Sequence, residues 1–259
     1  MWCLVLYSLL ACCLIMSLVW LWATKNKNAG VVDIFWSYNF PVIAFILLWM
    51  APGYEMRKVL FCSMVIIAGL RLGTFLAYRI FSHIDVEEGR YQELRKNYAP
   101  NVNRRFFLFF QFQAISNIIL AVPFFIITIN PNPDLSWLEY TGFGIWIISI
   151  LGETIADQQL SSFKKDHGNK EKVCQEGLWY YSRHPNYFFQ WLMWVSYFVF
   201  ALASPYGYLA IISPAIILLL ILKVTGIPPT EAQAVRSKGD AYKEYQRTTS
   251  AFFPWFKKE

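Results

Sequence analysis

Four polar side chains stand at the head of an apolar segment in the C-terminal half of the chain. They are Ser182, Arg183, His184 and Asn186. Pro185 lies among them, and proline suits the first turn of a helix because its φ is fixed and it has no N–H to leave unpaired. The free N–H groups and the dipole at a helix start favour an anion, so the run indicates an anion-binding turn. An anchor at the lipid headgroups, with an aromatic belt made by Trp179, Tyr180 and Tyr181, explains the same residues.

Two carboxylates form a second cluster. Glu153 and Asp157 are spaced i, i+4, which puts them on one face of a helix, and Lys164 continues the same stripe. Such a pair could act as general acid and base, or it could bind sugar hydroxyls, as acidic residues do with the ribose of adenosine. A solvated helix end tied to nearby lysines is the structural alternative.

Asp33 is a charged residue within an apolar segment, where charges are costly and mark candidate functional sites. Asp33, Trp36 and Ser37 follow at i, i+3, i+4 and share one helix face, which suits a cavity better than a lipid surface. The alternatives are that Asp33 caps its helix or pairs with Lys27. Arg71, midway along a later apolar segment, also needs a carboxylate or a ligand, and Asp33 and Glu153 are the candidates.

Further candidates lie in the C-terminal tail. Glu231, Tyr242 and Tyr245 could line a basic vestibule formed with the long loops at 82–105 and 157–186. Such a vestibule could hold a phosphorylated cofactor. A short amphipathic helix that packs on its own account would explain these residues equally well.

Composition identifies the class of protein that holds these residues. Of the 259 residues, 56% are hydrophobic and only 15% are charged, which indicates an integral membrane protein. The five cysteines lack metal-ligand spacing, so we expect neither a metal site nor a disulfide framework. The net charge of +6 does not indicate nucleic acid as a partner, because no binding module is recognisable and membrane lipids account for the charge.

The apolar segments predict an all-α membrane bundle of about seven transmembrane helices. The expected spans are 2–23, 31–51, 58–81, 106–129, 136–156, 187–203 and 206–223.

The basic residues between these spans predict the orientation of the bundle. Lysine and arginine concentrate in the loops at 24–30, 82–105 and 157–186 and in the tail, whereas the intervening loops hold Arg57 and Lys58 alone. Basic loops face the cytoplasm, so we expect the N-terminus outside and the C-terminus in the cytoplasm.

The order of the motifs is similar to that of a known family. Asp33-x-x-Trp36, Arg71-Leu72-Gly73 and the stretch 152–159 precede Gly177-Leu178-Trp179 and the Arg-His-Pro-Asn-Tyr-Phe run, and a Tyr-x-x-Tyr tail ends in Phe-x-Pro-Trp. Together they resemble an uncharacterised bacterial membrane family of the steroid 5-alpha-reductase superfamily, which is 3-oxo-5-alpha-steroid 4-dehydrogenase-like. The resemblance covers almost the whole chain beyond the first span.

The resemblance implies one integral membrane domain over 1–259, in the bacterial inner membrane. Its N-terminal helices, about 1–130, would form the side for a hydrophobic lipid or steroid-like substrate, and the half at about 136–259 would bind NADPH. The two cofactor-binding positions that steroid reductases place four residues apart correspond to Glu153, which stands where those enzymes have Asn, and Asp157. The later cofactor positions fall at Asn186 and at Gln190, which replaces a Glu.

The expected function is an NADPH-dependent reductase of an activated carbon–carbon double bond in a steroid-like or isoprenoid lipid. Asp33 is the expected polarising acid, with Tyr38 and Tyr78 as candidates on the proton side. An arginine and nearby lysines favour the 2′-phosphate of NADPH over NADH. The residues expected to hold the cofactor are Glu153, Asp157, Lys164, Arg183, His184, Asn186, Gln190, Glu231, Tyr242 and Tyr245.

Two other functions stay open from the sequence. The Arg-His-Pro-x-Tyr run is shared with S-adenosylmethionine-dependent methyltransferases of the isoprenylcysteine carboxyl methyltransferase type. Those enzymes have a Glu-Glu pair after the last helix, whereas Glu231 is followed here by Ala232. The other alternative is a non-catalytic membrane protein whose polar residues serve topology and packing.

Overall fold

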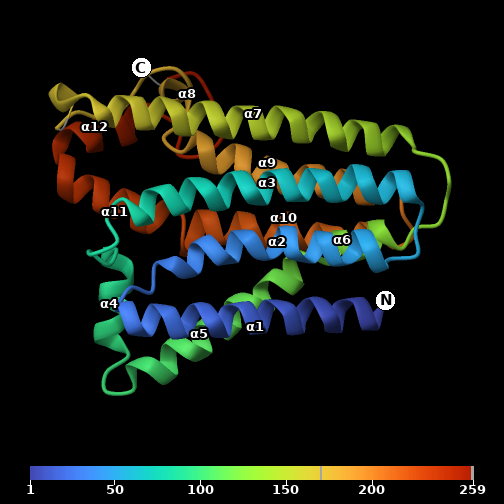
Figure 1. Cartoon of the computed structure of the whole chain (residues 1–259). Helices are drawn as coiled ribbons and strands as arrows, with labels where there is room; N and C mark the ends of the chain where they lie inside the picture. Colours follow the sequence, from blue (N-terminus) through green and yellow to red (C-terminus); the bar gives the residue numbers. More distant parts are fainter. Residues whose placement is uncertain (170, 258–259) are drawn as a thin grey trace. The chain divides into compact units, whose positions relative to one another are not determined.

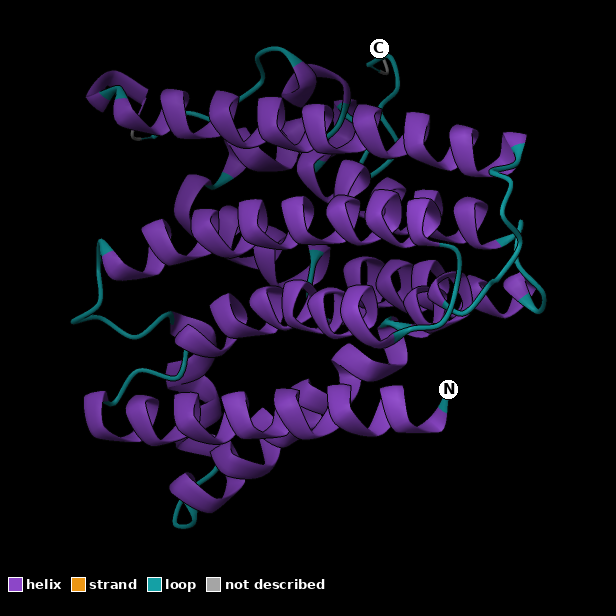
Figure 2. Cartoon of the chain, turned by 45° about the vertical axis from the view of Figure 1, so that its right-hand side comes forward, coloured by secondary structure: helices purple, strands orange, loops and turns teal. Residues whose placement is uncertain are grey.

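The computed structural model describes residues 1–169 and 171–257, and the regular elements in these ranges are all helices (Figures 1 and 2). They divide into two compact units, each built from two stretches of chain. Unit 1 comprises Met1–Leu135 with Ser204–Leu209, and unit 2 comprises Ser136–Ala203 with Ala210–Glu259. The boundary between Leu135 and Ser136 lies near the division expected between the halves, whose separate roles stay predictions.

Unit 1 contains the first six α-helices. Their bounds are Trp2–Asn26 (α1), Val31–Met50 (α2), Glu55–Phe81 (α3), Gly89–Asn97 (α4), Val102–Leu120 (α5) and Val122–Thr128 (α6). Helices α2 and α3 pack closely because glycines of α3 leave room for side chains of α2. A Cβ on Gly73 would lie 2.3 Å from the ring of Tyr38, and a Cβ on Gly69 would lie 2.4 Å from Pro41.

Polar side chains join α5 to the first two helices. The amide of Asn39 donates to Asn117 Oδ1 at 2.9 Å, and the Trp36 indole donates to Ser116 at 3.0 Å. Gln111 donates to the Ser17 hydroxyl at 3.1 Å. Such bonds stabilise helix pairs in lipid, where the hydrophobic effect does not drive helices together.

Two buried cations lie in the first turn of α3 and donate hydrogen bonds to backbone carbonyls. The Arg57 guanidinium donates to the carbonyls of Asn130 at 3.2 Å and Asp134 at 2.7 Å. Lys58 donates to the carbonyls of Leu48 and Ala51, at 3.2 and 3.1 Å. These side chains therefore satisfy backbone carbonyls at helix ends and in the loop that follows α6.

Unit 2 is organised around two long helices, at 137–165 and 185–201, that lie side by side (Figure 1). Its helices are Trp137–Lys165 (α7), His167–Asn169 (η1), Leu178–Tyr181 (α8), Pro185–Ala201 (α9), Ile212–Leu219 (α10), Leu220–Val224 (η3), Ile227–Lys238 (α11) and Asp240–Thr248 (α12), and the short helix Gly207–Ile211 (η2) begins in unit 1. Glycines of α7 allow it to pack closely against α9. A Cβ on Gly152 would lie 2.5 Å from the Phe189 ring, and one on Gly142 would lie 2.9 Å from Phe200.

Four of the described helical stretches are long and apolar enough to cross a membrane. They are Trp2–Asn26, Val31–Met50, Glu55–Phe81 and Gly207–Lys238. The α5–α6 pair, bent by 42°, makes a fifth if it counts as one span. The predicted segments at 136–156 and 187–203 are helical but are not among these stretches: α7 carries acidic residues, and α9 has only 17 residues. An integral membrane protein is thus supported, while seven spans and the orientation stay predictions.

Candidate functional site

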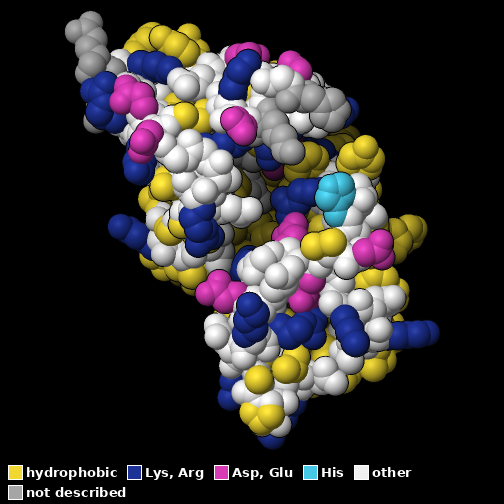
Figure 3. All heavy atoms as spheres, turned by 90° about the vertical axis from the view of Figure 1, so that its left-hand side faces the viewer, with side chains coloured by type: hydrophobic (Ala, Val, Ile, Leu, Met, Phe, Trp, Pro, Cys, Tyr) yellow, Lys and Arg dark blue, Asp and Glu magenta, His cyan; other side chains and the backbone are white. Residues whose placement is uncertain are grey.

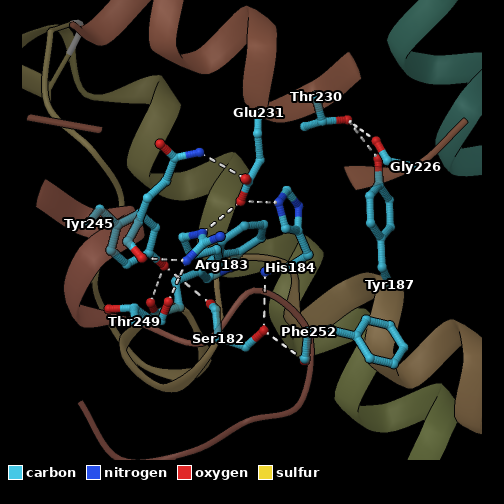
Figure 4. A network of polar contacts seen from close by, with 12 residues as sticks. Ser182, Arg183, His184, Tyr187, Gly226, Thr230, Glu231, Tyr245, Thr249 and Phe252 are labelled. Atoms are coloured by element: carbon cyan, nitrogen blue, oxygen red, sulfur yellow. Dashed lines mark hydrogen bonds and ion pairs between the residues drawn. The ribbon is translucent and has the colours of Figure 1, made fainter. Parts of the chain in front are cut away.

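The turn before α9 is held by a network that begins at Arg183 (Figure 4). Arg183 Nε donates to Glu231 Oε1 of α11 at 2.6 Å. Its Nη1 donates to the carbonyls of Gln246 at 2.9 Å and Thr249, at the end of α12. With side-chain exposures of 10% for Arg183 and 14% for Glu231, this ion pair is largely removed from solvent. The guanidinium is therefore engaged mainly inside the protein.

Glu231 has two more partners in the same network. Gln246 Nε2 donates to Glu231 Oε2 at 2.8 Å, and His184 Nε2 lies 3.2 Å from Glu231 Oε1. The His184 ring also stacks on Tyr187 with centroids 5.3 Å apart. Of the residues predicted to hold the cofactor, the structure thus brings together Arg183, His184 and Glu231.

The C-terminal segment fastens the backbone of this turn. The Ser182 hydroxyl donates to the Phe252 carbonyl at 2.9 Å, and the Arg183 N–H donates to the Ser250 carbonyl at 2.9 Å. The Tyr245 hydroxyl donates to the carbonyls of Trp179 and Ser182. Burial raises the pKa of Tyr245 well above its usual value, so the phenol keeps its proton and stays a donor at neutral pH.

A second group of predicted residues meets where α9 starts against α7. Helix α9 begins at Pro185, as its sequence predicts. Asn186 Nδ2 donates to Asp157 Oδ1 at 3.1 Å, and Asp157 is 6% exposed. Glu153 lies one turn earlier on α7 and is 4% exposed, so a solvated helix end does not describe this pair. Gln190 lies one turn after Asn186 and is half-buried.

Trp179 links the turn before α9, where the Arg183 network lies, to α7, which carries Glu153 and Asp157. Its indole donates to the Ala156 carbonyl of α7 at 2.9 Å, and the residue is buried. The aromatic belt that the sequence left open is therefore wrong for Trp179, whereas Tyr180 and Tyr181 are exposed.

The last two predicted cofactor residues of unit 2 differ in exposure. Tyr242 is buried, with its ring centroid 5.8 Å from that of Tyr245. Lys164 is exposed near the end of α7.

Asp33 in unit 1 has a partner that the sequence did not identify. Tyr91 Oη of α4 donates to Asp33 Oδ1 at 2.7 Å, and Tyr91 is 0% exposed. Burial, and then the nearby Asp33 carboxylate, raise the pKa of Tyr91 well above its usual value, so the phenol remains a donor. The sequence signal is faint, because Tyr91 is one aromatic residue in a charged loop.

The loop that carries Tyr91 is closed over the start of α2. Glu87 accepts two bonds of 2.8 Å from the Arg95 guanidinium and a third of 2.8 Å from the Ala29 N–H. Asn28 donates to the Ile84 carbonyl at 2.8 Å. Arg79, near the end of α3, pairs with Glu88 at 3.0 Å. These contacts fix α4 so that Tyr91 reaches Asp33.

The two tyrosines predicted on the proton side have other surroundings. The Tyr38 hydroxyl lies 3.3 Å from the Thr74 hydroxyl, and its ring fills the space beside Gly73. Tyr78 is 76% exposed. Among the described residues, neither hydroxyl is hydrogen-bonded to Asp33, which accepts its bond from Tyr91 instead.

Comparison with known proteins adds one finding. A family model described as "Protein of unknown function (DUF1295)" matches residues 19–249. No curated protein and no solved structure matches the chain.

Proposed function

The chain belongs to the DUF1295 family of proteins of unknown function, which is grouped with steroid 5-alpha-reductase-like proteins, and from that premise we propose that it is a membrane-embedded, NADPH-dependent reductase. Its substrate would be a steroid-like or isoprenoid lipid with an activated carbon–carbon double bond. We place it in the bacterial cytoplasmic membrane with the C-terminus inside, on the strength of the basic loops.

The observation that carries this proposal is the Tyr91–Asp33 pair. Reduction of a conjugated double bond needs a donor that polarises the carbonyl oxygen. Asp33 would offer such a donor in its protonated form, held in position by the hydrogen bond of 2.7 Å that it accepts from the Tyr91 phenol. Asp33 is half-buried in the first turn of α2, so it has surface that a substrate oxygen can approach.

The Tyr91–Asp33 pair would stabilise the negative charge that forms on the substrate oxygen during reduction. NADPH, when bound, supplies a hydride to the β-carbon of the double bond. The π electrons would then move towards the carbonyl oxygen, and a hydrogen bond from protonated Asp33, positioned by Tyr91, would stabilise the enolate. A proton delivered to the α-carbon completes the saturated product.

Unit 2 offers donor and acceptor groups that fit the cofactor. Buried Glu153 and Asp157, with the Asn186 amide, gather at the start of α9, and carboxylates bind the hydroxyls of ribose. Arg183 fits a 2′-phosphate less well, because Glu231 and two carbonyls already accept its hydrogen bonds. Lys164, exposed on α7, is the better cation for that phosphate.

Purified protein in mild detergent tests this function directly. We expect NADPH to bind in a fluorescence titration, and Asn186→Ala to weaken binding by about fivefold to tenfold through the loss of one hydrogen bond. Native mass spectrometry would identify any cofactor that stays bound during purification. Retention of S-adenosylmethionine in place of NADP(H) would favour the methyltransferase, and binding of neither would support a non-catalytic role.

A further inference from the structure

Unit 2 has a cavity of about 390 Å³ beside its C-terminal segment. One wall is polar and the other aromatic. The lining residues are Arg183, Gln246, Arg247, Thr249, Ser250, Ala251, Phe253, Trp255 and Phe256.

The aromatic wall turns its rings outward. Phe253, Trp255 and Phe256 are 55%, 70% and 72% exposed. Phe252, by contrast, is buried, with its ring centroid 5.8 Å from Phe188 and 5.7 Å from Trp191 of α9. Phe253 also contacts α9, with its ring centroid 5.7 Å from Phe188 and 5.8 Å from Trp191, but it and its two aromatic neighbours have most of their surface uncovered.

Two more exposed aromatic residues extend this surface. The Tyr181 ring lies 6.1 Å from Phe256, and Tyr180 carries the Lys257 ammonium 4.6 Å from its ring centroid. Tyrosine and tryptophan favour the boundary between headgroups and acyl chains, and lysine favours an anionic leaflet. Since this surface lies immediately before α9 in a membrane protein, lipid suits it better than water.

The polar wall contains a cation that can change partner. Arg247 has a 65% exposed side chain and pairs with Glu244, three residues earlier, at 2.7 Å. Exposed pairs of this kind contribute little, so a phosphate can replace the glutamate at small cost. Arg183 differs, because its buried pair with Glu231 fixes its guanidinium. Arg247 is therefore the residue available to a ligand.

We propose that this cavity binds the headgroup of an anionic phospholipid. Arg247 takes the phosphate, the Thr249 and Ser250 side chains line the glycerol region, and the acyl chains run over Trp255 and Phe256. A nucleotide also combines rings with phosphates, but the uncovered aromatic surface extends beyond one base and matches the acyl region of a lipid.

Native mass spectrometry of the full chain in a lipid-free neutral detergent tests the site. The protein is titrated with phosphatidylglycerol, with phosphatidylcholine of the same acyl chains, and separately with adenosine 2′,5′-bisphosphate. We expect phosphatidylglycerol to bind preferentially, and Arg247→Gln with Trp255→Ala to weaken it by about fivefold. Arg236→Gln and Trp137→Ala remove an exposed arginine and a 72% exposed tryptophan elsewhere in unit 2, and serve as controls.

Arg247→Lys separates a binding defect from a folding defect, since it keeps the charge and should retain most of the lipid. Equal binding of phosphatidylglycerol by the double variant and the controls would overturn the proposal. So would loss of bisphosphate binding with lipid binding unchanged, which would make the cavity a nucleotide site.

Discussion

Arg183 joins three helices through a single side chain, because its guanidinium reaches α11 and the end of α12 from the turn before α9. Glu231 in turn depends on Arg183 for its charge partner. Removing one member of a buried ion pair is costly, since the other charge stays in a poorly solvated place. At the residue scale, stability and the proposed cofactor binding therefore depend on the same turn and need separate measurements.

Arg183→Ala should lower the free energy of unfolding by about 3–5 kcal/mol, because it leaves Glu231 without its charge partner and two carbonyls without donors. Thermal unfolding of the purified protein, followed by circular dichroism, would measure this. Arg236→Ala on the exposed side of α11 is the control and should change little. Unchanged unfolding combined with weaker NADPH binding would instead make Arg183 a cofactor contact.

Tyr91→Phe should reduce turnover of an enone lipid by about a hundredfold while the protein still folds and binds NADPH, because only one hydrogen-bond donor is lost. Asp33→Asn should have a similar effect, since the amide keeps the size of the side chain. Tyr7→Phe on the exposed face of α1 controls for loss of a phenol. Full turnover in both test variants would remove the pair from the proposed reaction.

At the scale of helices, the contact between α7 and α9 sets the geometry of the predicted cofactor residues. Gly152 lies one residue before Glu153, and the Phe189 ring of α9 occupies the space that a side chain would need. Any separation of the helices there would also separate Asp157 from Asn186, which are now 3.1 Å apart.

Gly152→Ala should therefore weaken NADPH binding and lower the melting temperature, since the new Cβ would lie 2.5 Å from a ring carbon. Gly144→Ala is a matched control on the same helix, because a Cβ there has no neighbour within 4 Å. The melting temperatures and NADPH affinities of both variants are compared with the parent. Equal effects of the two changes would mean that helix propensity, and not packing, sets the outcome.

At the scale of the molecule, two basic residues on the predicted outer side have a structural explanation. Arg57 and Lys58 are buried and donate to backbone carbonyls, so they belong to helix ends and not to an exposed loop. The exposed basic residues of the loops then lie more completely on the predicted cytoplasmic side. Figure 3 looks onto the side where Figure 1 labels α11 and α12, and lysine and arginine side chains are numerous there.

Cysteine labelling tests the predicted orientation. In a Cys3→Ser background, an impermeant maleimide added to intact cells should label Asn132→Cys and leave Gly168→Cys unlabelled until the membrane is opened. Asn132 and Gly168 are both exposed in the structure, so access across the membrane alone should separate them. Labelling of position 168 from outside would reverse the orientation.

Local pattern predicted part of this molecule well. The apolar segment at 31–51 is the helix Val31–Met50, and Pro185 begins α9, since both depend on local hydrophobicity and backbone chemistry. The partners of Asp33 and Arg183 could not be predicted in this way. Tyr91 and Thr249 lie 58 and 66 residues from them, and contacts at that separation depend on how the chain folds back.

The fastening of the turn by the C-terminal segment has a consequence for biosynthesis. Thr249 leaves the ribosome 66 residues after Arg183, which at ~5–20 residues per second is a delay of roughly 3 to 13 seconds. During that interval α9 can already form, while the Arg183 guanidinium waits for its partners, because Glu231 and Gln246 follow 48 and 63 residues after it and Thr249 follows last. The turn before α9 therefore matures late, and the newly made protein passes through a stage in which helices are present but the turn has not yet been joined to the C-terminal segment.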